Sequence, residues 1–202
     1  MSTKRLFDMC LSALGLVISV PLWIIIPLAI KAEDGGPVFY FQERVGRGGC
    51  IFRLLKFRSM IVDAEKETGA VQATPDDPRV LRIGRLLRAT AMDELPQLVN
   101  ILKGDMSFVG PRALRPQEQE VLGNPDVLAI DQIPGYDRRL TVTPGLTGLA
   151  QVYLPADAPR RKKFRYDLLY IRRHFFWLDL KLILLSFLIT FKGKWEYRGK
   201  KV

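Results

Sequence analysis

A long apolar run near the N-terminus sets the first structural expectation. Residues 11–30 contain no charged side chain, and 20 such residues in a helix are long enough to cross the hydrocarbon core of a bilayer. Pro21 lies in the middle of the run, where it removes a backbone hydrogen bond and bends the helix. The Ser19 hydroxyl can bind a carbonyl freed by the break. The pattern predicts a membrane-embedded helix within residues 1–34 that is broken near Ser19 and Pro21.

The charges around this run favour a helix that enters and leaves the membrane on one side. Lys4 and Arg5 precede the run and Lys31 follows it, and positive residues prefer the cytoplasmic side. A re-entrant helix satisfies both flanks, although a bent crossing helix is also compatible with proline. The run is long for a signal peptide and lacks a small-x-small cleavage site, so we expect it to be retained.

A second apolar stretch lies near the C-terminus and differs from the first. Residues 175–191 are strongly apolar but include Asp179 and Lys181, and Arg172 and Arg173 precede them. Internal charges with basic and aromatic flanks predict interfacial amphipathic helices near residues 160–191. A buried core helix is the alternative. The basic run 160–165 suits anionic lipid headgroups, or an ordinary solvated helix face.

Between these stretches the pattern predicts one compact domain over residues 35–202. Residues 38–42 and 51–57 are rich in Val, Ile and Phe, and a glycine-containing loop joins them as a hairpin. Helical periodicity dominates the remainder. The predicted fold is therefore mainly α with a small β-hairpin, an N-terminal re-entrant membrane helix, and interfacial helices packed on a single domain that faces the cytoplasm.

An acidic pair, Asp93 and Glu94, stands out in this basic chain. We expect it to open an amphipathic helix that Gly104 ends, with Pro96 tolerated in the first turn. Thr90 and Asp93 match the Ser/Thr-x-x-Asp/Glu capping pattern, and the pair taken alone fits helix capping better than catalysis. The core-facing positions of this helix are Leu95, Leu98, Val99 and Leu102.

Composition narrows the chemistry that the chain can perform. Lys and Arg number 31 against 21 Asp and Glu, a net charge of +10 that predicts an anionic partner. One histidine and two cysteines without metal-ligand spacing nearly exclude histidine-based triads and zinc catalysis, which leaves carboxylates as reactive groups. The cations that suit phosphate oxygens are Lys56, Arg58, Arg88 and Arg112.

Five sequence blocks, in order along nearly the whole chain, resemble those of the bacterial sugar transferases, the small monotopic phosphoglycosyl transferases. The chain length resembles the minimal catalytic form of that family. The blocks are Glu43-Arg-Val-Gly, Lys56-Phe-Arg-Ser-Met60, Asp93-Glu-Leu-Pro-Gln-Leu98, Lys103-Gly-Asp-Met-Ser-Phe-Val-Gly-Pro-Arg112 and Pro144-Gly-Leu-Thr-Gly-Leu-Ala-Gln-Val152.

The resemblance implies a Mg²⁺-dependent enzyme of the bacterial inner membrane. It implies transfer of a sugar-1-phosphate from a UDP-sugar to undecaprenyl phosphate in the inner leaflet, with release of UMP, as the first membrane step of a glycoconjugate pathway. Asp93 matches the family's nucleophile, which forms a covalent aspartyl-phosphosugar, and Glu94 with Asp93 matches its metal site. The position of the pair in the sequence fits either carboxylate as the nucleophile.

Two residues depart from the family pattern, and two other functions stay open. The helix break has Val20 between its serine and proline, and Ala113 replaces a second proline after Arg112. A membrane-anchored basic protein without enzymatic activity also explains the charge and the apolar run. A processive glycosyltransferase would release UDP instead of UMP. We expect no nucleic-acid partner; the sugar and the oligomeric state stay open.

Overall fold

The N-terminal apolar run forms two helices with a sharp bend between them. The computed structural model describes residues 2–64, 66, 77–116, 129–155, 157–173 and 175–191. Helix α1 (Thr3–Ile18) and helix α2 (Leu22–Asp34) meet at an angle of 61°. At the break, the Ser19 hydroxyl donates to the Leu16 carbonyl (3.2 Å) and accepts from the Trp23 indole N–H (3.1 Å). The predicted break, and the role of Ser19 in it, are confirmed.

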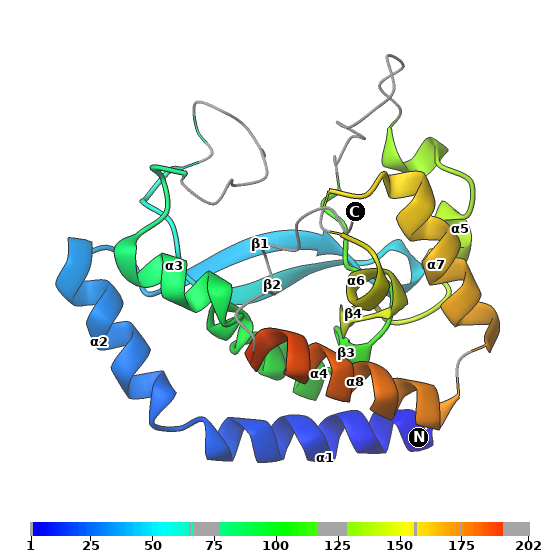
Figure 1. Ribbon diagram of the computed structural model, residues 1–202, viewed down its shortest axis with the longest axis horizontal. Helices are drawn as coiled ribbons and strands as arrows, with labels where there is room; N and C mark the ends of the chain where they lie inside the picture. Colours follow the sequence, from blue (N-terminus) through cyan, green and yellow to red (C-terminus); the bar gives the residue numbers. More distant parts are fainter. Residues whose placement is uncertain are drawn as a thin grey trace.

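Helix α1 begins eight residues before the apolar run because its first half packs against the rest of the molecule. The Arg5 guanidinium donates to the carbonyls of Ile101 and Leu102 at the end of helix α4 (Gln97–Lys103). The Asp8 carboxylate accepts the Phe108 N–H at 3.1 Å. Figure 1 shows α1 lying along the base of the molecule, below α4 and α8. Within the described ranges, no single helix is long and apolar enough to cross a membrane, whereas the bent α1–α2 pair passes that test.

The predicted hairpin is confirmed, with a longer first strand. Strand β1 (Phe39–Val45) pairs antiparallel with β2 (Ile51–Phe57), from the Phe39–Phe57 pair to the Val45–Ile51 pair. A short 3₁₀ turn, η1 (Arg47–Gly49), joins the strands. Gly48 and Gly49 have φ values of 69° and 80°, a region that residues with a Cβ rarely adopt, which explains the glycines of this loop.

A second, parallel pair of strands was not predicted. Strand β3 (Ser107–Val109) pairs with β4 (Gly145–Thr147), and each strand has only three residues. The backbones of the two segments approach so closely that a Cβ on Gly145 would lie 2.0 Å from the Gly110 nitrogen. The described part of the chain therefore contains two small sheets among its helices.

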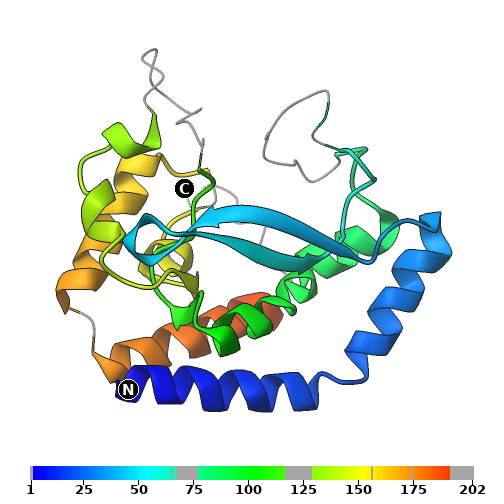
Figure 2. The same ribbon diagram turned by 180° about the vertical axis from the view of Figure 1, so that it is seen from behind.

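Two helices at the end of the described chain agree with the prediction. Helix α7 (Arg160–Arg173) and helix α8 (Phe176–Phe191) follow one another, and α8 lies beside α1 (Figures 1 and 2). Asp179 binds the Lys4 ammonium at 2.6 Å and the Tyr170 hydroxyl at 2.7 Å, which joins both helices to α1.

The exposed side of α8 excludes the buried core helix that the sequence left open. Asp179 and Leu182 are its two buried residues. The large exposed apolar side chains of α8 are Phe176, Trp177, Leu184, Phe187, Leu188 and Phe191.

The core lies between the hairpin and the helices beneath it. Trp23 of α2, Phe39 and Phe57 form an aromatic cluster with Ile30, at the end of the hairpin near α2. The boundary predicted after residue 34 coincides with the end of α2, but the division into a membrane segment and a 35–202 domain stays a prediction. Other elements are α3 (Arg82–Ala89), η2 (Met92–Glu94), η3 (Ile130–Gln132), α5 (Tyr136–Arg139) and α6 (Leu149–Tyr153).

Candidate active site

The acidic pair lies in a short turn beside the end of strand β2. Asp93 and Glu94 belong to the 3₁₀ turn η2, and both side chains are nearly buried, with 10% and 12% of their surface exposed. The Lys56 ammonium lies 2.6 Å from a Glu94 oxygen and 3.7 Å from an Asp93 oxygen. Burial opposes ionisation of Glu94, but the charges of Lys56 and Arg112 outweigh it and lower the pKa of this carboxyl. Glu94 is therefore ionised at neutral pH.

The expectation that the pair opens a helix after a Thr90 cap is wrong. Thr90 ends α3, and its hydroxyl donates back to the Leu86 carbonyl at 2.7 Å. Ala91 has a φ of 53°, a left-handed conformation uncommon for a residue with a Cβ, and it turns the chain into η2. Pro96 then precedes α4, where its missing N–H leaves no helix hydrogen bond unmade. The pair thus lies in its own turn between two helices.

Asn100 of α4 holds this turn against the hairpin. Its side-chain oxygen accepts the Leu55 N–H at 3.0 Å, and its amide donates to the Arg53 carbonyl at 2.8 Å. The two bonds replace a strand partner for β2 next to Lys56, so α4 cannot slide along the strand without breaking them. Ile101 and Leu98 bury the adjacent face, whereas Leu102, expected in the core, is exposed. Asn100 thereby keeps Lys56 opposite the acidic pair.

Arg112 lies on a segment whose backbone is fixed at every carbonyl. The side chain itself is exposed, and its charge acts on Glu94. Four successive carbonyls, those of residues 111–114, each accept a hydrogen bond, and the donors come from β4, α5 and β1. The donors, in order, are Gly145 N–H (2.9 Å), Arg139 Nη2 (2.7 Å), Arg44 Nη1 (3.0 Å) and Val45 N–H (2.9 Å).

The four predicted phosphate-binding cations differ in their contacts. Lys56 contacts both carboxylates. Arg88 lies in the last turn of α3. Hydrogen bonds from Arg79 lower the pKa of the Asp77 carboxyl to about 2, and the charge of Arg88 contributes to this lowering.

Arg58 differs from the role expected of it. Its guanidinium is buried and binds both oxygens of Asp34, with further hydrogen bonds to the carbonyls of Pro37 and Met60. These contacts join the end of α2 to the end of β2. Arg58 therefore holds the fold together, and its contacts give no support to the phosphate-binding role predicted from its position.

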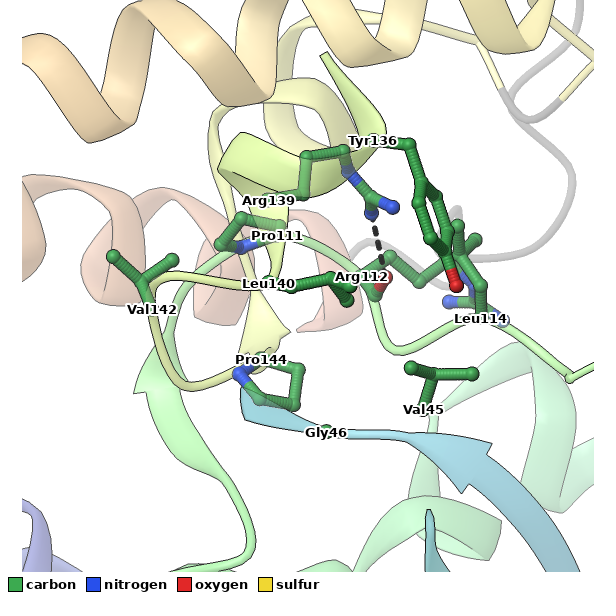
Figure 3. Close-up of a pocket in the computed structure, with 10 residues that line it drawn as sticks. All are labelled: Val45, Gly46, Pro111, Arg112, Leu114, Tyr136, Arg139, Leu140, Val142 and Pro144. Atoms are coloured by element: carbon green, nitrogen blue, oxygen red, sulfur yellow. Dashed lines mark hydrogen bonds between the residues drawn. The ribbon is translucent and has the colours of Figure 1, made fainter. Parts of the chain in front are cut away.

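A shallow hollow with a volume of only about 10 Å³ borders the Arg112 segment (Figure 3). Tyr136 is half-buried in its wall beside Leu114 and packs against the apolar cluster around that residue. Arg139 lies in the same wall, and its hydrogen bond to the Arg112 carbonyl is drawn in Figure 3. The hollow is small and mostly apolar, so it adds a recess next to the cation without enclosing a whole substrate.

A comparison of the sequence with known proteins identifies its family. The sequence model of the bacterial sugar transferases matches residues 1–193, nearly the whole chain. The chain belongs to this family. The resemblance in the sequence blocks is thereby confirmed.

Several relatives of this bacterial sugar transferase carry names that state their substrates. A Klebsiella pneumoniae UDP-glucose:undecaprenyl-phosphate glucose-1-phosphate transferase is 42% identical over 195 residues, which cover 94% of this chain and 40% of the relative. A Caulobacter vibrioides protein of the same name is 40% identical, covering 90% of this chain and 67% of that protein. An Aeromonas hydrophila UDP-N-acetylgalactosamine-undecaprenyl-phosphate N-acetylgalactosaminephosphotransferase is 39% identical, covering 89% and 41%. The chain thus spans about two fifths of the Klebsiella relative's length.

Three positioning residues of this bacterial sugar transferase escaped the sequence interpretation. Asn100, Arg44 and Arg139 act on backbone groups far away in the sequence, and nothing in their local pattern indicates those partners. Arg44 and Asn100 had one signal, their position in the sequence, and Arg139 had none. Arg44 lies within the Glu43-Arg-Val-Gly block, and Asn100 lies in the helix between two others.

Proposed function

We propose that this chain is a phosphoglycosyl transferase that moves a sugar-1-phosphate from a UDP-sugar to undecaprenyl phosphate and releases UMP. The observation that carries the proposal is the nearly buried pair Asp93 and Glu94, in contact with Lys56 and under the charge of Arg112. The names of the relatives support the substrates. The proposed role is the first membrane step of a glycoconjugate pathway.

The proposed chemistry has two steps at one carboxylate. An Asp93 oxygen attacks the sugar-bearing phosphorus, a new O–P bond forms, and the P–O bond to UMP breaks with its electron pair leaving on UMP. An oxygen of the polyprenyl phosphate then attacks the same phosphorus, and the Asp93–phosphorus bond breaks to restore the carboxylate. A covalent intermediate divides a difficult transfer into two easier displacements. It also lets a water-soluble donor and a lipid acceptor use the site in turn.

The residues around Asp93 suit a reaction between anions. A carboxylate that approaches a diphosphate is repelled, and cations must offset this repulsion. Lys56 lies close enough to hold Asp93 and to neutralise Glu94. Arg112 has an exposed guanidinium on a backbone fixed at four carbonyls, so it can bind phosphate oxygens without moving the chain. Asp93 is assigned as the nucleophile from the family resemblance.

Mg²⁺ is part of the proposal, and the residues fit it. Within the described parts of the chain, no group of three or more His, Cys, Asp or Glu side chains could hold a metal ion. Mg²⁺ does not need such a group, because it is held by one or two carboxylates together with substrate phosphates. Glu94, with Asp93, would hold the ion. When bound, it would supply positive charge that neutralises the phosphates.

We also propose that the protein is monotopic in the inner membrane, with the catalytic domain facing the cytoplasm. Both ends of the α1–α2 pair contact the same body: Arg5 binds α4, and Glu33 accepts the backbone N–H of Arg82 (2.6 Å) and Ile83 (2.9 Å) at the start of α3. A pair held at both ends favours re-entry over crossing. The large exposed apolar residues of the pair are Leu6, Leu14, Val17, Ile18, Val20, Ile24, Ile25 and Leu28.

Replacing the nucleophile tests the proposal. Asp93→Asn keeps the size of the side chain and removes its charge, and we expect UMP release to fall at least about 10⁴-fold. Co-sedimentation with liposomes should stay unchanged. Asp137→Asn, at an exposed position of α5, is the matched control and should retain full activity.

Chromatography of the nucleotide product, with a panel of UDP-sugars and polyprenyl phosphate, gives the second readout. Release of UMP supports the proposal, whereas release of UDP would identify a glycosyltransferase. Substantial turnover by purified Asp93→Asn would refute the nucleophilic role.

A further inference from the structure

The direction in which the Arg112 side chain leaves the backbone depends on the two peptide groups beside it. The Pro111 carbonyl accepts the Gly145 N–H at 2.9 Å, which holds the peptide before Arg112. The Arg112 carbonyl accepts a hydrogen bond from Arg139 Nη2 at 2.7 Å, which holds the peptide after it. Because a residue has only two soft backbone torsions, a rotation about either one strains these bonds. One donor is a backbone group, whereas the other is a side chain that must itself be held in place.

Helix α7 holds the Arg139 side chain in place. The Asp167 carboxylate accepts the Arg139 Nε–H at 2.8 Å. The guanidinium carbon lies over the Phe164 ring, 4.2 Å from its centre. Phe164 and Asp167 are three residues apart, so they share one face of the helix. A carboxylate and an aromatic ring on a single helix therefore restrain the same guanidinium.

The contact between Arg139 and Asp167 is closed to water. Their side chains have only 5% and 4% of their surface exposed, and Phe164 is buried with them. Helices α5 and α7 approach so closely beside the ion pair that a Cβ on Gly135 would lie 2.5 Å from Leu168 Cδ1. Loss of one partner of a buried ion pair is strongly destabilising, because the other charge stays buried without a counter-charge. The position of the guanidinium therefore depends on the charge of Asp167.

Stability of the fold alone gives no reason for this ion pair. The Phe164 ring beneath the guanidinium belongs to a buried apolar cluster with Leu114, Ile130 and Ile133. Apolar side chains in place of a buried ion pair often leave the stability of a protein unchanged or raise it. Such side chains cannot donate a hydrogen bond to the Arg112 carbonyl. The guanidinium supplies that donor, and the carboxylate of α7 keeps the donor charged and in place.

We propose that Asp167 is a positioning residue of the transfer reaction, which acts through Arg139 on the backbone of Arg112. The inference rests on the proposed function, in which the Arg112 guanidinium contacts phosphate. Asp167 and Arg139 are buried, so they set the direction of the Arg112 side chain without contacting the substrate themselves. Helix α7, which the sequence predicts only as an interfacial helix, thereby supports the active site through one buried contact.

A double-mutant cycle on the full chain in detergent separates positioning from general damage. Asp167→Asn keeps the size of the side chain and removes the counter-charge of Arg139. We expect it to lower kcat/KM for UMP release by about 30-fold, because a displaced catalytic group loses much of its effect. In the Arg112→Gln background the same change should lower kcat/KM by less than about threefold, since the group that it positions is already absent. Equal factors in the two backgrounds would overturn the proposal.

Two further variants keep the test decisive if Asp167→Asn folds poorly. Arg139→Lys retains a charge for Asp167 but replaces the planar fork of donors with one ammonium, and it should show the same dependence on Arg112. Ile133→Ala is the matched control, because it weakens the apolar cluster beside Arg139 and leaves both charges in place. Its thermal midpoint should fall while kcat/KM of the folded protein stays within about twofold of the wild type. An equal loss of kcat/KM in Ile133→Ala and Asp167→Asn would show a purely structural role.

Hydrogen exchange of the Gly145 amide reports on the same segment without turnover. This amide donates to the Pro111 carbonyl, on the other side of Arg112 from the bond of Arg139. We expect its exchange to be about tenfold faster in Asp167→Asn and unchanged in Ile133→Ala, because only the first variant releases the Arg112 peptide. Unchanged exchange in Asp167→Asn would overturn the proposal. Failure of the proposed function would appear instead in the nucleotide that the wild type releases.

Discussion

Arg58 and Arg112 illustrate how two arginines with the same predicted role acquire different ones. Arg58 is buried at the end of β2, and its guanidinium is bound by Asp34 and by backbone carbonyls. Arg112 has an exposed guanidinium, and its backbone takes the hydrogen bonds instead. A cation whose head group is held by the fold stabilises the fold. A cation whose backbone is held, and whose head group is exposed, can serve a substrate.

Removing the Arg112 guanidinium should give the largest effect in this comparison. We expect Arg112→Gln to lower kcat/KM for UMP release by about 100-fold or more, the usual loss for a charged group that contacts the reacting phosphate. The thermal midpoint should change little, because the backbone bonds of residues 111–114 remain. Arg165→Gln, an exposed arginine of α7, is the control for a lost surface charge. A large fall in the thermal midpoint of Arg112→Gln would place Arg112 with Arg58 as a structural cation.

Removing the partner of Arg58 should affect stability instead. Asp34→Asn leaves a buried guanidinium without its counter-charge, and we expect the free energy of unfolding to fall by about 1–3 kcal/mol. The kcat/KM of the folded protein should stay within about threefold of the wild type. Glu43→Gln, an exposed carboxylate on β1, should be neutral in denaturant titration. If Asp34→Asn unfolds like the wild type but loses activity, Arg58 belongs to the active site after all.

The elements that the sequence predicted are those whose causes are local. The break at Ser19 and Pro21 follows from a missing N–H, and the hairpin follows from two runs rich in Val, Ile and Phe with Gly48 and Gly49 in the turn. Helices α7 and α8 follow from their periodicity. The strands β3 and β4 have three residues each, which is too short for an alternation of apolar and polar residues to appear. Their pairing could therefore not be predicted from the sequence.

The candidate site was predictable in its residues but not in its geometry. The acidic pair and Arg112 were identified from blocks in the sequence. Their placement depends on Asn100, Arg44 and Arg139, whose partners lie 27 to 69 positions away. The pairing of Arg58 with Asp34 is also non-local, and no spacing rule distinguishes it from a phosphate contact.

Mass measurement of the intact protein tests the central claim, a covalent phosphosugar on Asp93, most directly. Protein incubated with Mg²⁺ and an accepted UDP-sugar, without lipid acceptor, should gain the mass of one sugar phosphate and release one equivalent of UMP. Peptide analysis should place the added mass on Asp93, and polyprenyl phosphate should then remove it. Asp93→Asn should gain no mass. A wild-type protein that releases UMP only when the lipid acceptor is present, and never carries the added mass, would contradict the two-step account.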